Sequence, residues 1–103
     1  MYVSDELKKE VWLKTAQFQS FENDVNWFRK DQCWAWIRRS DYWNRDSIYW
    51  WEIDHIIPIA NWWPDYLSNL RVLHRKNNLE KSNWRLVCSV SSHWNTNINI
   101  SNY

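Results

Sequence analysis

The sequence predicts a small α+β domain, because three local patterns indicate a helix, then strands, then a second short helix. Ser4 followed by Asp5 and Glu6 is typical of a helix N-cap with acids in the first turn. The aromatic and β-branched run at residues 49–53 is typical of a strand. We therefore expect a helix at residues 5–16, strands at 49–53 and 70–73, and a helix at 75–82.

The segments between these elements carry weaker patterns. Residues 17–32 are polar with scattered aromatics, whereas the apolar stretch at 33–37 precedes a turn and predicts the first arm of a hairpin. Pro58 lacks a backbone N–H, so regular strand pairing is expected to stop nearby. The tail is expected to add a strand at 86–90 and then fray. The whole chain, 1–103, is interpreted as one domain, with a helical extension at 4–32, a core at 49–83 and a polar tail at 89–103.

Composition favours a globular protein without a membrane span. Of the 103 residues, 24% are charged and 45% hydrophobic. No apolar run reaches the roughly 18 residues that a membrane-crossing helix needs, and residues 1–12 do not resemble a signal peptide. We therefore expect a cytoplasmic protein. Cys33 and Cys88 form no CxxC pair and are expected to be two free thiols rather than a disulfide.

The glycine and tryptophan counts are anomalous. Average usage predicts about seven glycines in a chain of this length, yet there are none, and 11 residues are tryptophan. We hypothesise that seven tryptophans occupy ancestral glycine positions, because several stand in turn-like contexts: Trp34, Trp43, Trp50, Trp62, Trp63, Trp84 and Trp94. The other four are interpreted as ordinary core residues: Trp12, Trp27, Trp36 and Trp51. A recoded stop codon or deliberate substitution would produce this pattern; the alternative is a genuine surface for stacking nucleic-acid bases.

The stretch WEIDHIIPIANWWPDYLSNLRVLHRKNNLEKSN at residues 51–83 resembles the HNH endonuclease motif. The resemblance depends on DHIIP at 54–58, LSNL at 67–70 and NLEK at 78–81, found in the family's order and at its separations. It implies a ββα-metal finger, in which strand, loop, strand and helix surround one cation. In the family a glycine pair commonly fills the loop, where this chain has Trp62 and Trp63.

Phosphodiester cleavage needs an activated water and stabilisation of negative charge. The Asp54 carboxylate and the Asn78 carbonyl are oxygen ligands suited to Mg²⁺, or to another divalent cation such as Mn²⁺. His55 is the expected general base, since an imidazole can accept a proton near neutral pH. The resemblance makes Asn69 the residue that pins the loop and so orients His55. Asp54 and His55 can serve one phosphate only if the strand ends there, because neighbours on a regular strand face opposite ways.

Further candidates surround this set. Glu52 shares a strand face with Asp54, and His74 is an alternative ligand, although packing at the core edge or a phosphate contact is the preferred interpretation. The net charge is only +1, but basic residues cluster at 29–45 and 71–85, where they can meet phosphates or simply be solvated. The expected DNA contacts are Lys81, Arg75, Arg71, Lys76, Arg38 and Arg39.

Many HNH proteins also hold a structural zinc ion with two CxxC pairs. The corresponding positions here are Cys33 with Trp36 and His74 with Asn77, so two of the four ligands are missing. No structural zinc is therefore expected.

The resemblance implies a single-metal endonuclease that hydrolyses DNA and leaves 5′-phosphate and 3′-hydroxyl ends. One chain carries one site, so it is expected to nick unless a second copy or a partner protein addresses the other strand. The alternative is a non-catalytic nucleic-acid-binding module on a degenerate HNH scaffold. A toxin-like effector would use the same chemistry.

Overall fold

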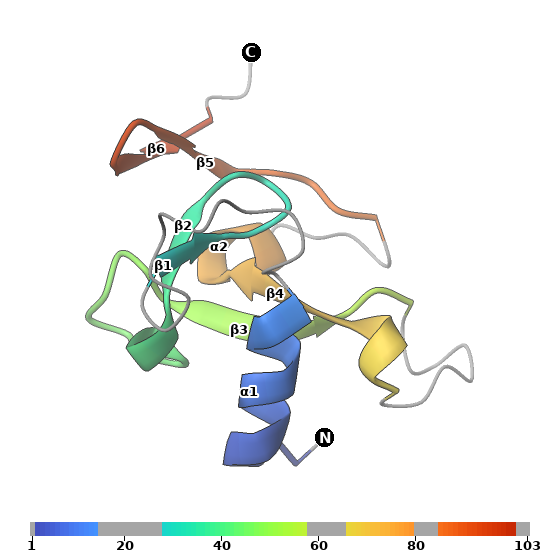
Figure 1. Cartoon of the computed structure of the whole chain (residues 1–103). Coiled ribbons are helices and arrows are strands. Elements are labelled where there is room, and N and C mark those ends of the chain that lie inside the picture. The colour runs from blue at the N-terminus through green and yellow to red at the C-terminus, as the bar shows by residue number, and fades with distance from the viewer. Residues whose placement is uncertain (1, 15–27, 58–65, 80–84, 101–103) are drawn as a thin grey trace.

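The computed structural model describes residues 2–14, 28–57, 66–79 and 85–100. Within these ranges the chain forms two α-helices, two 3₁₀ turns and three two-stranded antiparallel sheets (Figure 1). The helices are α1 (Asp5–Lys14) and α2 (Arg75–Leu79), and the 3₁₀ turns are Arg39–Asp41 and Leu67–Asn69. The strands are β1 (Phe28–Lys30), β2 (Trp36–Arg38), β3 (Trp51–His55), β4 (Leu70–His74), β5 (Val90–His93) and β6 (Thr96–Asn99).

The first helix begins where the sequence predicts. Ser4 Oγ accepts a hydrogen bond from the Leu7 N–H at 3.1 Å, which satisfies one of the free donors of the first turn. Val11 and Trp12 are buried on the face of α1 that meets β4. The rings of Trp12 and Trp51 lie 5.1 Å apart, so these two tryptophans are core residues, as predicted. The core cluster consists of Val11, Trp12, Ile37, Trp51, Leu70 and Val72.

The β3–β4 pair is the element that carries the motif. The two strands pair from Trp51 opposite His74 to His55 opposite Leu70, and α2 follows β4 directly and contacts both strands. The strand expected at 49–53 begins two residues later and ends at His55, while the strand expected at 70–73 is confirmed with one further residue. The helix expected at 75–82 begins at Arg75, and its described part ends at Leu79.

The expectation that residues 33–37 open a hairpin is wrong. β2 is the second arm of a hairpin, paired with β1 from Phe28 opposite Arg38 to Lys30 opposite Trp36. Two of the three residues of β1 are cations, although Arg29 is only 2% exposed. A search for alternating hydrophobic residues therefore does not detect this strand.

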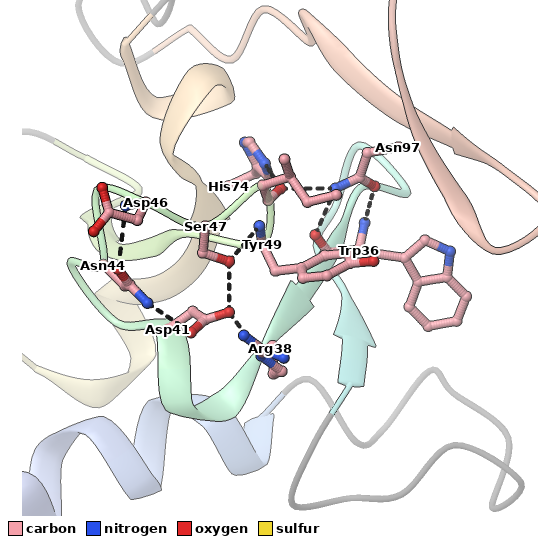
Figure 2. A network of polar contacts seen from close by, with 10 residues as sticks. Trp36, Arg38, Asp41, Asn44, Asp46, Ser47, Tyr49, His74 and Asn97 are labelled. Atoms are coloured by element: carbon pink, nitrogen blue, oxygen red, sulfur yellow. Dashed lines mark hydrogen bonds and ion pairs between the residues drawn. The ribbon is translucent and has the colours of Figure 1, made fainter.

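The tail also differs from the prediction. The strand expected at 86–90 begins only at Val90, and β5 and β6 form a hairpin where fraying is expected. Asn97 anchors this hairpin: its side chain accepts from the Trp36 N–H at 2.6 Å and donates to the carbonyls of Trp36 and Ile48. Figure 2 shows these bonds. Polar side chains therefore hold a segment whose composition suggests disorder.

The expectation of two free thiols is wrong as well. Cys33 in the β1–β2 loop and Cys88 before β5 form a disulfide with a Cα–Cα distance of 5.5 Å. A sequence separation of 55 gives no sign of this proximity. Free thiols would have favoured a protein from a reducing compartment, and the disulfide takes that argument away. No helix in the described ranges has the length and apolar character that crossing a bilayer requires.

Candidate functional site

Glu52, Asp54 and Asn78 lie on the α2 side of the β3–β4 pair. Alternation along β3 places Glu52 and Asp54 on the face opposite Trp51, which belongs to the core. The two acids are 5% and 4% exposed, respectively. Asn78 Nδ2 donates to Glu52 Oε1 at 2.7 Å, so α2 is joined to this face through a predicted metal ligand. Two carboxylates and a side-chain amide therefore belong to one side of the motif.

Two arginines neutralise these carboxylates. Arg71, opposite Asp54 in the β3–β4 register, donates from Nε to Asp54 Oδ2 at 2.8 Å. Arg75 Nε lies 3.5 Å from Glu52 Oε2. Arg71 also donates from Nη1 to Gln32, while its buried Nη2 has no hydrogen-bond partner among the described residues. One buried N–H group of the Arg71 guanidinium is thus not satisfied by any described residue.

Asn69 fixes the chain that leaves β3. Its Oδ1 accepts from the Ile57 N–H and its Nδ2 donates to the Ile57 carbonyl, both at 2.9 Å. The Asn69 carbonyl accepts from the Ile56 N–H at 2.8 Å. Asn69 is 5% exposed, so water competes little for these bonds. The two residues after His55 are therefore clamped to the start of β4.

His55 is the last residue of β3 and is half-buried. β3 ends with His55 still paired to Leu70, so alternation along the strand places the Asp54 and His55 side chains on opposite faces. Residues 58–65, which include Pro58, Trp62 and Trp63, lie outside the described residues, as do Lys81 and Trp84.

His74 is buried at the end of β4, and both of its ring nitrogens contact backbone. Nε2 lies 2.8 Å from the Ile48 carbonyl, and Nδ1 accepts from the Lys76 N–H at 3.1 Å. Burial lowers the pKa of His74 below its ordinary value, which outweighs the opposing effect of the Ile48 carbonyl. A neutral imidazole with both nitrogens engaged fits packing at the core edge better than metal ligation.

The predicted DNA-contacting cations are differently placed. Arg38 pairs with Asp41 at 2.7 Å in a network that includes Asn44 and Ser47 (Figure 2). Burial alone would raise the pKa of Asp41, but hydrogen bonds from Arg38, Ser47 and Asn44 lower it. The Arg39 guanidinium lies 5.9 Å from the centre of the Trp51 ring. Arg38 and Arg39 therefore have structural partners.

Lys76 on α2 is exposed. It lies on the same short helix as Arg75, one residue after it. These two cations and Arg71, unlike Arg38 and Arg39, lie on β4 or α2 beside the predicted ligands.

Sequence reasoning missed a buried polar cluster behind α2. Asp31, 6% exposed, accepts hydrogen bonds from the backbone N–H groups of Cys33, Ala35 and His74 and from Asn77 Nδ2. The local signal for it is Asp31 itself, because an Asp side chain commonly accepts from the backbone N–H two residues on, as in an Asx turn. Nothing in the sequence indicates its bonds across more than 40 residues.

No group of three or more His, Cys, Asp or Glu side chains suited to a metal ion occurs within residues 2–14, 28–57, 66–79 and 85–100. Any cation bound by Asp54 and Asn78 would therefore need oxygen ligands from water or substrate as well.

Of three comparisons with known proteins, one finds a match, and it covers the motif. No curated protein and no solved structure matches the chain. A family model does match, and it spans β3, β4 and α2 together with the loop before them. Residues 44–85 match the HNH endonuclease family, which confirms the resemblance that the motif predicts.

Proposed function

We propose that this protein is an HNH-type endonuclease that hydrolyses DNA phosphodiester bonds with one divalent cation, Mg²⁺ or Mn²⁺. The observation that carries the proposal is the family match over residues 44–85, combined with Glu52, Asp54 and Asn78 on one side of β3, β4 and α2. In this proposal β3, β4 and α2 form the family's ββα-metal finger.

The chemistry of the donor set fits such a cation. Asp54 offers carboxylate oxygen and Asn78 a neutral carbonyl oxygen, the hard ligands that Mg²⁺ prefers, and waters and phosphate complete such shells. Bound there, the cation would stabilise the negative charge that develops on the phosphate. Glu52 accepts a hydrogen bond from Asn78 Nδ2 and so orients the Asn78 amide.

The chain's own residues supply the other functions. His55 accepts a proton from the attacking water, and Asn69 keeps the chain after His55 in place through its three hydrogen bonds. Arg71, Arg75, Lys76 and Lys81 attract the DNA backbone. Arg71 holds Asp54 through Nε and would be available to a phosphate if a cation took its place at that carboxylate.

One observation favours the alternative, a binding module without catalysis. The Asp54 carboxylate is already paired with the Arg71 guanidinium at 2.8 Å and is almost fully buried. A fixed arginine in place of the cation would leave the HNH scaffold able to bind DNA but unable to cut it.

Metal removal distinguishes these functions. We expect the wild-type protein to nick supercoiled plasmid in Mg²⁺, to stop when EDTA is added, and to resume when excess Mg²⁺ is restored. The measurement is the conversion of supercoiled to open-circular DNA on a gel, with a parallel mobility-shift titration. DNA binding without nicking in either Mg²⁺ or Mn²⁺ would establish the binding module instead.

A further inference from the structure

Three tryptophans adopt a backbone conformation that favours glycine. Within the described residues, positive φ occurs at Trp34 (63°), Trp43 (56°) and Trp94 (57°), and at no other residue. A Cβ in this left-handed region crowds the following carbonyl, and a large side chain rarely occurs there. All three belong to the seven tryptophans that stand in a sequence context typical of glycine.

The turn at Trp43 illustrates the requirement. The Asn44 N–H donates to the Asp41 carbonyl at 3.2 Å, which places Tyr42 and Trp43 at the two central positions of a β-turn. Tyr42 has φ −60° and ψ 120°, and Trp43 has positive φ. These dihedrals define a type II turn, whose second central residue is typically glycine.

The other two positions also belong to turns. The Trp34 N–H donates to the Asp31 carbonyl at 3.0 Å, so Trp34 is the fourth residue of an Asp-led turn, where glycine is favoured. Trp94 is the first of the two residues that connect β5 to β6, and Asn95 after it lacks positive φ. Positive φ at the first residue alone is the type II′ hairpin pattern, in which that residue is glycine.

The indole rings at these positions are not part of the core. Trp34, Trp43 and Trp94 are 57%, 54% and 82% exposed, whereas Trp12 and Trp51 are 2% and 0% exposed. Their indoles contact surface neighbours, such as Lys30 beside Trp34 and Trp50 beside Trp43, and do not belong to the core cluster.

We propose that the protein made in its native cell carries glycine at positions 34, 43 and 94, which is the result expected if the codon at these positions is a stop codon that the cell reads as glycine. Trp50 is described and lacks positive φ, and Trp62, Trp63 and Trp84 lie outside the described residues, so the backbone supports the proposal at three positions. The proposal is independent of the nuclease function.

Paired substitutions in the full-length chain test the backbone argument. At each of the three positions, the Gly variant (Trp34→Gly, Trp43→Gly, Trp94→Gly) is compared with the Ala variant, which also removes the indole but keeps Cβ. We expect Gly to lower the unfolding equilibrium constant about 5- to 30-fold relative to Ala. The measurement is urea denaturation followed by circular dichroism.

Trp36 in β2 is the matched control, because it is a tryptophan without positive φ. There the order is expected to reverse, with Trp36→Gly less stable than Trp36→Ala. Equal stability of Gly and Ala at 34, 43 and 94 would overturn the proposal. So would a coding sequence in which these three codons are the same as those at Trp12 and Trp51, or a mass spectrum of the native protein that retains all three indoles.

A different observation carries a second inference, which rests on the proposed function. Asp31 and Asn77 join four segments of the chain behind α2. Asp31 Oδ2 accepts from the His74 N–H and from Asn77 Nδ2, both at 2.9 Å. Asn77, which is 0% exposed, accepts on Oδ1 from the Ser89 and Val90 N–H groups, both at 2.8 Å. The β1–β2 loop, β4, α2 and the start of β5 therefore meet at this pair.

The second helix needs this external support. The described part of α2 has five residues, and an isolated helix shorter than about 12 residues is marginal in water. The bonds of Asn77 therefore set where the next residue, Asn78, stands. We infer that Asp31 is a positioning residue for the metal site: it fixes Asn77 and through it the amide of Asn78.

Asp31→Asn tests this inference with little change in shape, because it replaces an acceptor oxygen with an NH₂ group that faces N–H donors. We expect Mn²⁺ to bind about 10- to 100-fold more weakly, as measured by electron paramagnetic resonance titration of the full-length protein. The matched control is Asp41→Asn, the same substitution at a buried Asp that accepts from Arg38, Asn44 and Ser47. The control should lower the melting temperature without changing Mn²⁺ affinity.

Wild-type affinity in a folded Asp31→Asn variant would overturn the inference. Equal weakening by both variants would also overturn it, because the effect would then reflect general loss of stability. A wild-type protein that neither binds Mn²⁺ nor nicks DNA contradicts the proposed function itself, so the two failures are distinguishable.

Discussion

His55→Ala is expected to reduce the plasmid-nicking rate by about 10²- to 10⁴-fold in saturating Mg²⁺, the range typical for loss of a general base. His55 ends β3, and Asn69 clamps the two residues that follow it. Because Asp54, Asn78 and the flanking cations are unchanged, metal and DNA binding should persist. The measurement is the single-turnover nicking rate, accompanied by Mn²⁺ and DNA titrations of the same preparation.

His93→Ala is the matched control for this experiment. His93 is an exposed imidazole at the end of β5 and lies outside the family match. Its removal should leave the nicking rate within a factor of about two, since an exposed substitution away from the site changes little. Normal nicking by His55→Ala would exclude His55 as the base and leave the identity of the proton acceptor open to another residue of the motif.

The parts of the fold that the sequence predicts well are those with local causes. Ser4 indicates the start of α1, because an N-cap acts on its own first turn. The run ending at Asp54 and His55 indicates β3 within two residues, because β-branched and aromatic residues suit a strand wherever it pairs. The motif spacing then identified a segment that the family model matches.

The parts that it misses depend on contacts between distant residues. The Cys33–Cys88 bond, the anchoring of β6 by Asn97 and the bonds from His74 and Asn77 to Asp31 each connect segments that only the folded chain brings together. In the site, sequence spacing suggested Asp54 and Asn78 as ligands but gave no sign that Arg71 pairs with Asp54. Cross-strand register, which places these two residues opposite each other, is a tertiary property.

Replacing both cysteines, Cys33→Ser with Cys88→Ser, is expected to destabilise the protein by about 4 kcal/mol. A crosslink lowers the entropy of the unfolded chain, by about 3 kcal/mol for a 15-residue loop and about 4.7 for a 100-residue loop. The separation of 55 residues lies between these limits. Against a total of about 5–15 kcal/mol for a typical domain, this loss is large. Urea denaturation of both proteins measures it.

Reductant supplies the control for this prediction. Dithiothreitol should lower the urea midpoint of the wild-type protein toward that of the double serine variant and leave the variant unchanged, since only the former has a bond to reduce. A wild-type protein insensitive to reductant, with two thiols that react with a thiol reagent after unfolding without reductant, would contradict the disulfide. Because the bond ties the β1–β2 loop to the segment before β5, beside Asp31 and Asn77, its loss should also weaken Mn²⁺ binding. The free energy of unfolding and the Mn²⁺ affinity of the proposed metal site are therefore expected to decline together on reduction.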